Sequence, residues 1–177
     1  MSNLKTFATL AVTAALLAAP AAAQRPCLSD EEAQTLALVA LPEIMRETGR
    51  VCADRLPAAS LIRREGGPVL GKYQAAADRA WPAARAAIVK LSDPAVDLLL
   101  QSDYARPVLT SVIAPYIVGR IELADCATID RLVTDLEPLP ARNTADAIVT
   151  VLRYLKESKA RGGKVAVPEL PLCPTPR

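Results

Sequence analysis

Apolar residues recur at helical spacing along most of this chain. In the first such segment they are Ala33, Leu36, Ala37, Ala40, Leu41, Ile44 and Met45, a spacing that places them on one face of a helix. Ser29 and Glu32 precede the segment at the positions of a capping box, and Gly49 is predicted to cap its other end. Pro42 lies inside the segment, so the helix must bend there or divide in two.

The same spacing predicts several further helices. Their ranges are a short one at 58–65, a long one at 70–91, and others at 94–101, 104–119, 124–137 and from Asn143 or Thr144 to Gly162. Pro82 and Pro115 lie inside two of them and are expected to bend them. The segment 107–118 is apolar on most sides, which predicts the central and most buried helix.

Strand signals are nearly absent, because apolar and polar residues alternate only around 165–167. The last segment, 164–177, contains four prolines and is expected to be an extended tail. The sequence therefore predicts an all-α fold: a compact, single-domain bundle of five to seven helices, several of them kinked by proline, followed by this tail.

The N-terminus has the pattern of a secretory signal peptide. Lys5 precedes an uncharged apolar run that ends before Pro20, and the small residues Ala21–Ala23 follow. Cleavage there gives a signal peptide at 1–23 and a single mature domain at 24–177. The run is shorter than the about 20 residues that cross a bilayer, so the mature chain is not expected to be an integral membrane protein. An uncleaved membrane anchor is the alternative.

Four cysteines remain in the mature chain, and an even number in an exported protein predicts two disulfides. Cys27 and Cys52 flank the first helix, whose ends would lie almost 30 Å apart if it were straight. A disulfide needs Cα atoms within about 7 Å. We therefore favour Cys52–Cys126 together with Cys27–Cys173, although four cysteines allow two other connectivities. The second of these bridges would tie the tail to the start of the mature chain.

The composition excludes several chemistries. The chain has no histidine, so it lacks the imidazole of serine and cysteine hydrolase sites and of histidine-ligated zinc. Neither a CxxC pair nor a glycine-rich phosphate loop occurs. Loss of Lys5 leaves a mature net charge of 20 − 19 = +1, which gives no reason to expect nucleic acid. We expect no cofactor and no metal.

Two sets of charged residues could carry catalysis. The first is Glu43, Arg46, Glu47 and Arg50, in which a buried glutamate could be a general acid, but the spacing favours a helix face of salt bridges. The second is Glu122, Asp125, Asp130 and Asp135, in which two carboxylates could hydrolyse a glycosidic bond. Helix-end placement of Asp125 is the simpler interpretation of the second set.

Three other features could bind a ligand or a partner. Trp81 with Tyr73 is a possible contact surface, with core packing as the alternative. The pair Arg63–Arg64 is too small for a nucleic-acid or membrane patch and is expected to serve capping and solubility. The apolar segment 107–118 could line a cavity for a small apolar ligand, with ordinary burial as the alternative.

The leading hypothesis is a small non-catalytic protein, periplasmic or secreted, that binds another protein or an envelope component. It rests on the export pattern and on the lack of a recognisable set of catalytic residues. The alternatives are a carrier of a small apolar ligand and a carboxylate-dependent hydrolase of cell-wall polymer. The sequence leaves the specific partner and the oligomeric state open.

Overall fold

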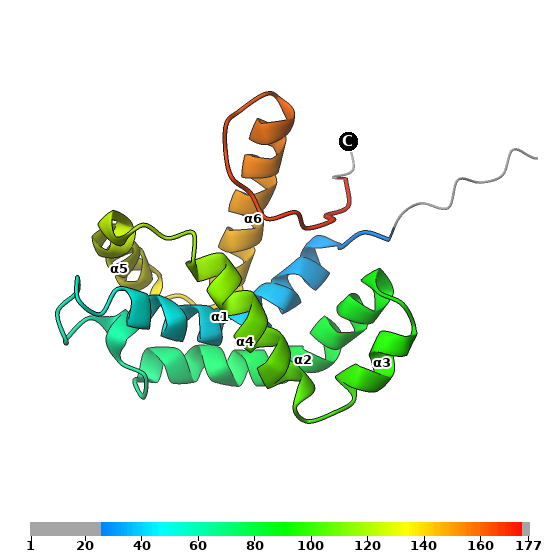
Figure 1. The fold of residues 1–177 in the computed structure, drawn as a ribbon, viewed down its shortest axis with the longest axis horizontal. Coiled ribbons are helices and arrows are strands. Elements are labelled where there is room, and N and C mark those ends of the chain that lie inside the picture. Colours follow the sequence, from blue (N-terminus) through cyan, green and yellow to red (C-terminus); the bar gives the residue numbers. More distant parts are fainter. Residues whose placement is uncertain (1–25, 175–177) are drawn as a thin grey trace, which may run out of the picture.

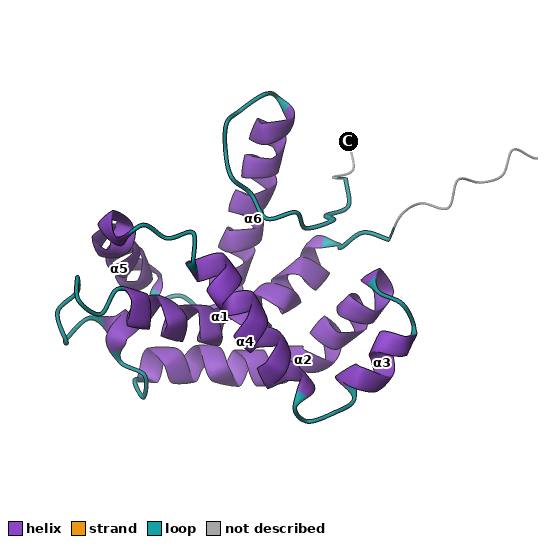
Figure 2. Cartoon of the chain, viewed as in Figure 1, coloured by secondary structure: helices purple, strands orange, loops and turns teal. Residues whose placement is uncertain are grey.

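The computed structural model describes residues 26–174, so the predicted signal peptide at 1–23 lies outside the described residues. Within that range the chain forms six α-helices and two short 3₁₀ turns, with no strand (Figure 2). The elements are α1 (Asp30–Val51), η1 (Leu61–Arg63), α2 (Pro68–Leu91), α3 (Ala95–Leu100), α4 (Ala105–Val118), η2 (Leu123–Asp125), α5 (Cys126–Leu136) and α6 (Ala141–Ala160). The predicted all-α class with five to seven helices is confirmed.

Helix α1 begins at the predicted capping box. The Glu32 backbone amide donates to the Ser29 hydroxyl at 3.2 Å, and the Ser29 amide donates to the Glu32 carboxylate at 2.7 Å. The helix continues through Pro42, and α2 likewise continues through Pro82. Both helices change direction along their length (Figure 1), as expected where a proline removes a backbone hydrogen bond.

Gly49 does not cap α1, and that prediction was wrong. The residue lies inside the helix and is buried, and a Cβ atom on it would overlap the backbone carbonyl oxygen of Ile62. Glycine is therefore required here because another part of the backbone passes against the helix, and not because the helix ends.

Two other helix boundaries differ from the prediction. The segment 58–65 forms only the 3₁₀ turn η1, because the burial of Ile62 beside Cys52 and Cys126 fixes its path across the end of α1. Helix α6 starts at Ala141, directly after Pro140, without a side-chain cap. Thr144, one of the predicted caps, is instead buried, with its hydroxyl 3.0 Å from that of Tyr73.

The centre of the structure is α1, which packs most extensively against α2 and also contacts α4 and α6. Its pairing with α2 is antiparallel, because the late part of α1 meets the early part of α2. Met45 packs near Val69 and Tyr73. Toward the other end, Val39 packs against Ala80 and Ala84, and Ala33 shares a cluster with Ala87. The alanines of α2 leave little side chain between the two helices, so their backbones can approach closely.

Helix α4 is not the most buried helix, contrary to the prediction. Its only fully buried residues are Ala114 and Val118. The reason is that α4 packs mainly against α1, with a small contact to α3. One neighbour covers only one side of a helix, and α4 is apolar on its other sides as well.

Both disulfides form as predicted. Cys52 and Cys126 join the end of α1 to the start of α5, with Cα atoms 5.6 Å apart, and both residues are fully buried. Cys27 and Cys173 join the two ends of the described chain, with Cα atoms 4.9 Å apart. Both bridges lie within the reach of an ordinary disulfide.

The tail is extended, as predicted, and returns along α6 to the start of α1 (Figure 1). Leu28 and Leu172 form a parallel bridge, in which the Leu28 amide donates to Pro171 at 2.7 Å and the Cys173 amide donates to Leu28 at 2.8 Å. Arg153 of α6 donates to the Cys173 carbonyl at 2.8 Å. These contacts and the disulfide hold the tail over the completely buried Leu28.

The close contact at Gly49 can be tested by a matched pair of substitutions. Gly49→Ala should lower the free energy of unfolding by about 1–3 kcal/mol or more, because the new methyl group has to displace the Ile62 backbone. Gly71→Ala, in α2, should raise the same free energy by up to about 1 kcal/mol, because nothing lies within 4 Å of the added atom. Urea unfolding of both variants measures this difference, and equal effects would contradict it.

Candidate functional site

A cavity of about 580 Å³ opens between α1, α2, the connection from α3 to α4, and the start of α4. Its size falls within the range of small-molecule sites. The lining residues are Val39, Pro42, Glu43, Arg46, Gln74, Trp81, Arg85, Leu100, Gln101, Ser102, Asp103, Arg106, Pro107 and Thr110. We call this space the arginine cavity, because three arginines from three helices line it.

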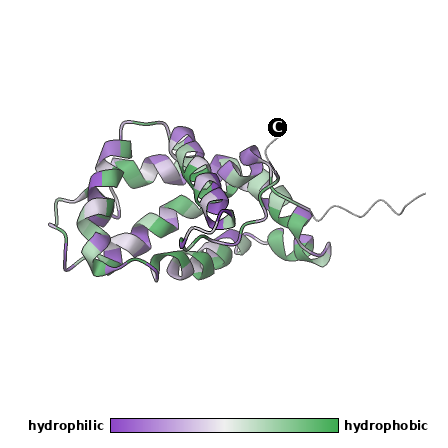
Figure 3. Ribbon diagram, turned by 90° about the horizontal axis from the view of Figure 1, so that it is seen from above, coloured by the Kyte–Doolittle hydropathy of each residue, from purple (hydrophilic) through white to green (hydrophobic). Residues whose placement is uncertain are grey.

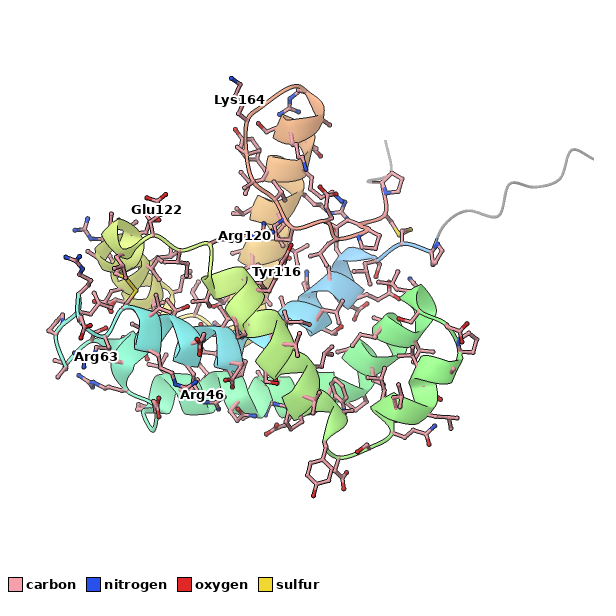
Figure 4. The ribbon with its side chains drawn as sticks, viewed as in Figure 1. Arg46, Arg63, Tyr116, Arg120, Glu122 and Lys164 are labelled. Carbon is pink, nitrogen blue, oxygen red and sulfur yellow. A yellow bond between two sulfur atoms is a disulfide. The ribbon has the colours of Figure 1, made fainter. Side chains whose placement is uncertain are left out.

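Arg46 of α1 is fixed by two neighbours. It forms an ion pair with Glu43, one turn earlier, and donates to the Gln74 side-chain oxygen of α2 at 3.0 Å. Figure 4 shows Arg46 extending from α1 toward α2. The predicted i,i+3 salt bridge is thus present, but it lines a cavity and is only about a quarter exposed.

The other two arginines are held by aspartates from different elements. Arg85 of α2 binds Asp97 of α3 at 2.9 Å, and Arg106 of α4 binds Asp78 of α2 at 2.5 Å. The hydrogen bond from Arg106 lowers the pKa of Asp78, and the hydrogen bond from Arg85 lowers that of Asp97. The guanidinium groups therefore keep fixed positions at the rim while both carboxylates stay ionised.

Trp81 forms part of the apolar wall of the cavity. It is partly buried and packs against Val39, Ala80 and Ala84. Tyr73 lies elsewhere: it is 3% exposed, and its hydroxyl is bonded to Thr144. Tyr73 therefore belongs to the core, which was the alternative interpretation, because α6 covers that side of α2.

The remaining charged candidates lie away from the cavity. Arg50 binds Glu47 at 3.2 Å, as the spacing predicts. Among the acidic set on η2 and α5, Asp130 accepts a hydrogen bond from Ser60, and the other three carboxylates are exposed: Glu122, Asp125 and Asp135. None of the four lines the arginine cavity.

Arg63 and Arg64 serve the loop that carries them. Arg63 donates to the Leu56 carbonyl at 2.7 Å, and Arg64 donates to the Ala59 carbonyl at 2.6 Å. Both side chains thus satisfy backbone acceptors in the irregular segment before α2. This agrees with the predicted structural role.

The outer side of α4 carries a second candidate site. Tyr104, Val108, Val112 and Tyr116 are between 60% and 78% exposed and recur every four residues. We call these four residues the α4 row, and at 1.5 Å per residue it extends about 18 Å. Tyr116 and Arg120 lie together at the end of α4 (Figure 4), where Arg120 donates to the tyrosine hydroxyl at 2.6 Å.

Hydrophobic residues occur along the other helices as well (Figure 3), and some of them are exposed. Leu98 and Leu99 of α3 are more than 70% exposed, and Val151 and Tyr154 of α6 are more than half exposed. The α4 row differs from these pairs because it has four members, spaced four residues apart from the N-cap Tyr104 to Tyr116 near the end of α4.

Residues 26–174 show neither a metal-binding cluster nor a single membrane-spanning helix. No group of three or more cysteines, aspartates and glutamates in this range is arranged to hold a metal ion. No single described helix is long and apolar enough to cross a bilayer; α4 and the segment Leu123–Leu136 meet that criterion only together, with a 92° bend between them.

Sequence reasoning missed two of the three cavity arginines. Arg85 and Arg106 stand in helices as ordinary charged positions, and their partners lie 12 and 28 residues away along the chain. No local spacing relates such partners. Only the Glu43–Arg46 pair has a spacing that a sequence can reveal.

No protein-family model, no curated protein and no solved structure matches this chain. The class of protein is therefore defined by its own features. It is a small all-α protein with two disulfides, which indicate an oxidising environment.

The lowered pKa values of Asp78 and Asp97 predict an acid-dependent loss of stability. A carboxyl with a lowered pKa binds fewer protons in the folded state, so its stabilising effect is present above the ordinary aspartate pKa and is lost as the pH falls below it. Combined Asp78→Asn and Asp97→Asn substitution should reduce stability at neutral pH and flatten the decline on acidification. The effect should be modest, because both pairs are partly exposed.

Urea unfolding at neutral and acid pH measures this change. Asp135→Asn is the control, because Asp135 is exposed and forms no ion pair with any residue between 26 and 174. An unchanged acid slope in the double variant would contradict the assignment.

Proposed function

We propose that the mature chain is an exported binding protein, periplasmic or secreted, that recognises a protein partner and catalyses no reaction. The observation that carries this proposal is the α4 row. Four large side chains on α4 and its N-cap Tyr104 are 60% to 78% exposed, and water contact with that much apolar surface is unfavourable. A partner that covers the row would remove it from water.

The chemistry of the row favours a protein as its partner. Tyrosine is enriched at protein interfaces, because its ring supplies apolar area while its hydroxyl forms a hydrogen bond. Tyr104 and Tyr116 stand at the two ends of the row, and Val108 and Val112 lie between them. Arg120, stacked 4.7 Å from the Tyr116 ring, adds a charged group at the edge. Apolar centres with polar edges are typical of interfaces.

Export is supported by two independent features. The first 23 residues have the order of charge, apolar run and small residues that marks a signal peptide. All four cysteines form disulfides, which persist in oxidising compartments.

The carboxylates that a hydrolase would use lie on the surface or in hydrogen bonds, so the geometry supports binding better than hydrolysis.

The export part of the proposal is tested by intact mass spectrometry of protein purified from its own host without reductant. The expected mass lacks residues 1–23 and is lower by two hydrogen atoms for each of the two disulfides. Reduction should restore those hydrogen atoms. A reduced chain that still carries Met1 would contradict export.

The binding part is tested by site-specific photo-crosslinking in intact host cells. A photoreactive residue at Ser111, which is exposed between Val108 and Val112, should give one discrete adduct whose added mass is that of a protein. The same residue at Arg142, an exposed position on α6, is the control and should give no such adduct.

Val108→Glu with Val112→Glu should abolish the Ser111 adduct. Both side chains point to water, so the variant should fold, and a desolvated carboxylate in the interface costs more than the contact yields. An adduct that survives this double substitution, or that forms equally from Arg142, would contradict the proposal.

A further inference from the structure

The arginine cavity has chemical features that the α4 row does not share. Its three guanidinium groups donate hydrogen bonds to the carboxylates of Glu43, Asp97 and Asp78. These bonds leave some of the guanidinium N–H donors without a partner. Guanidinium carries five N–H donors. Among described residues, Nη1 of Arg85 has no hydrogen-bond partner, and neither do Nε and Nη2 of Arg106.

Asp103 supplies the opposite charge. It lines the cavity three residues before Arg106, is exposed, and forms no ion pair or hydrogen bond with another residue in the described range. The cavity thus presents unused cationic donors and an unused carboxylate in the same lining. An ammonium group is the natural partner of the carboxylate, and a carboxylate is the natural partner of the guanidinium groups.

The charge balance argues against a simple anion. The three arginines of the cavity are accompanied by four carboxylates, counting Asp103 with the three that hold them. An anion would gain from the guanidinium groups but would be repelled by the carboxylates that hold them and by Asp103. A molecule with both charges can pair with both kinds of group.

The other lining residues are mixed: Gln74, Gln101, Ser102 and Thr110 are polar, and five are apolar. Trp81 and Leu100 lie in the same cavity as Val39 and the prolines Pro42 and Pro107. The indole offers a flat face for a ring or a methyl group. A ligand that fits all three features has a free carboxylate, a free ammonium and an apolar side chain.

We infer that the arginine cavity binds a short peptide with free amino and carboxyl ends and an apolar side chain. The carboxylate lies on the free donors of Arg85 and Arg106, the ammonium on Asp103, and the side chain against Trp81. This site is separate from the α4 row, so the inference does not rest on the proposed protein partner.

The experiment uses the mature, disulfide-bonded protein and the dipeptide Ala-Phe as the probe. Trp81 is the only tryptophan in the chain and lines the cavity, so its fluorescence reports binding directly. Ala-Phe should give a saturable change in emission. The N-acetylated and the C-amidated forms should each bind about tenfold more weakly, because each has lost one charged contact.

Two variants assign the ends of the peptide. Asp103→Asn should weaken binding of Ala-Phe by about tenfold but leave binding of its N-acetylated form unchanged, because that form has no ammonium to lose. Arg106→Gln should weaken the free dipeptide more than the C-amidated form. Asp103 is exposed, so its variant remains informative if the loss of Arg106 disturbs the fold. Asp135→Asn, outside the cavity, is the matched control.

Three results would overturn the inference. They are the absence of a saturable change at millimolar dipeptide, equal binding of the free and blocked forms, and displacement of the dipeptide by acetate alone at the same concentration. None of these results bears on the crosslinking at Ser111, so the inference and the proposed function fail separately.

Discussion

The close packing of α1 against α2 is the interaction on which the rest of the structure depends. Small residues of α2, among them Ala80 and Ala84, face Val39 of α1 and let the two helices approach closely. The two disulfides extend this pair at both ends. Cys52–Cys126 joins α5 to the end of α1, and Cys27–Cys173 joins the tail to its beginning. Every other helix is placed by contact with this pair or by a disulfide bonded beside it.

This arrangement explains why α4 carries two different surfaces. Ala114 and Val118 are buried, where the helix packs against α1. A second side, with Arg106, borders the arginine cavity, and a third side carries the α4 row. A helix in the middle of a bundle would have all three sides covered. Because α4 lies at the edge, its apolar residues remain available to a partner, and its first turn remains available to a ligand.

The arginine cavity depends on long-range pairing. Arg85 is held by Asp97, and Arg106 is held by Asp78, each from another element. These hydrogen bonds use only some of the N–H donors of each guanidinium group. Arginine is suited to this role because its planar group forms several hydrogen bonds at once. Fixed orientation before binding reduces the entropy that a ligand would otherwise lose. The inferred peptide would meet guanidinium groups already in place in the cavity, whereas the α4 row offers a larger, mainly apolar surface.

Sequence patterns were enough to predict most of the helices and the capping box at Ser29. The reach of a disulfide argued against only one pairing, Cys27–Cys52, and the structure settled the choice between the other two. The helices and the cap depend on neighbours within a few residues, and the excluded pairing depends on a simple distance limit. Three features follow from packing between distant segments: Gly49 lies against the Ile62 backbone, α4 is exposed, and distant arginines share a cavity. Helical periodicity shows which residues share a face, but which face becomes covered depends on segments far away in the chain, and no local pattern records them.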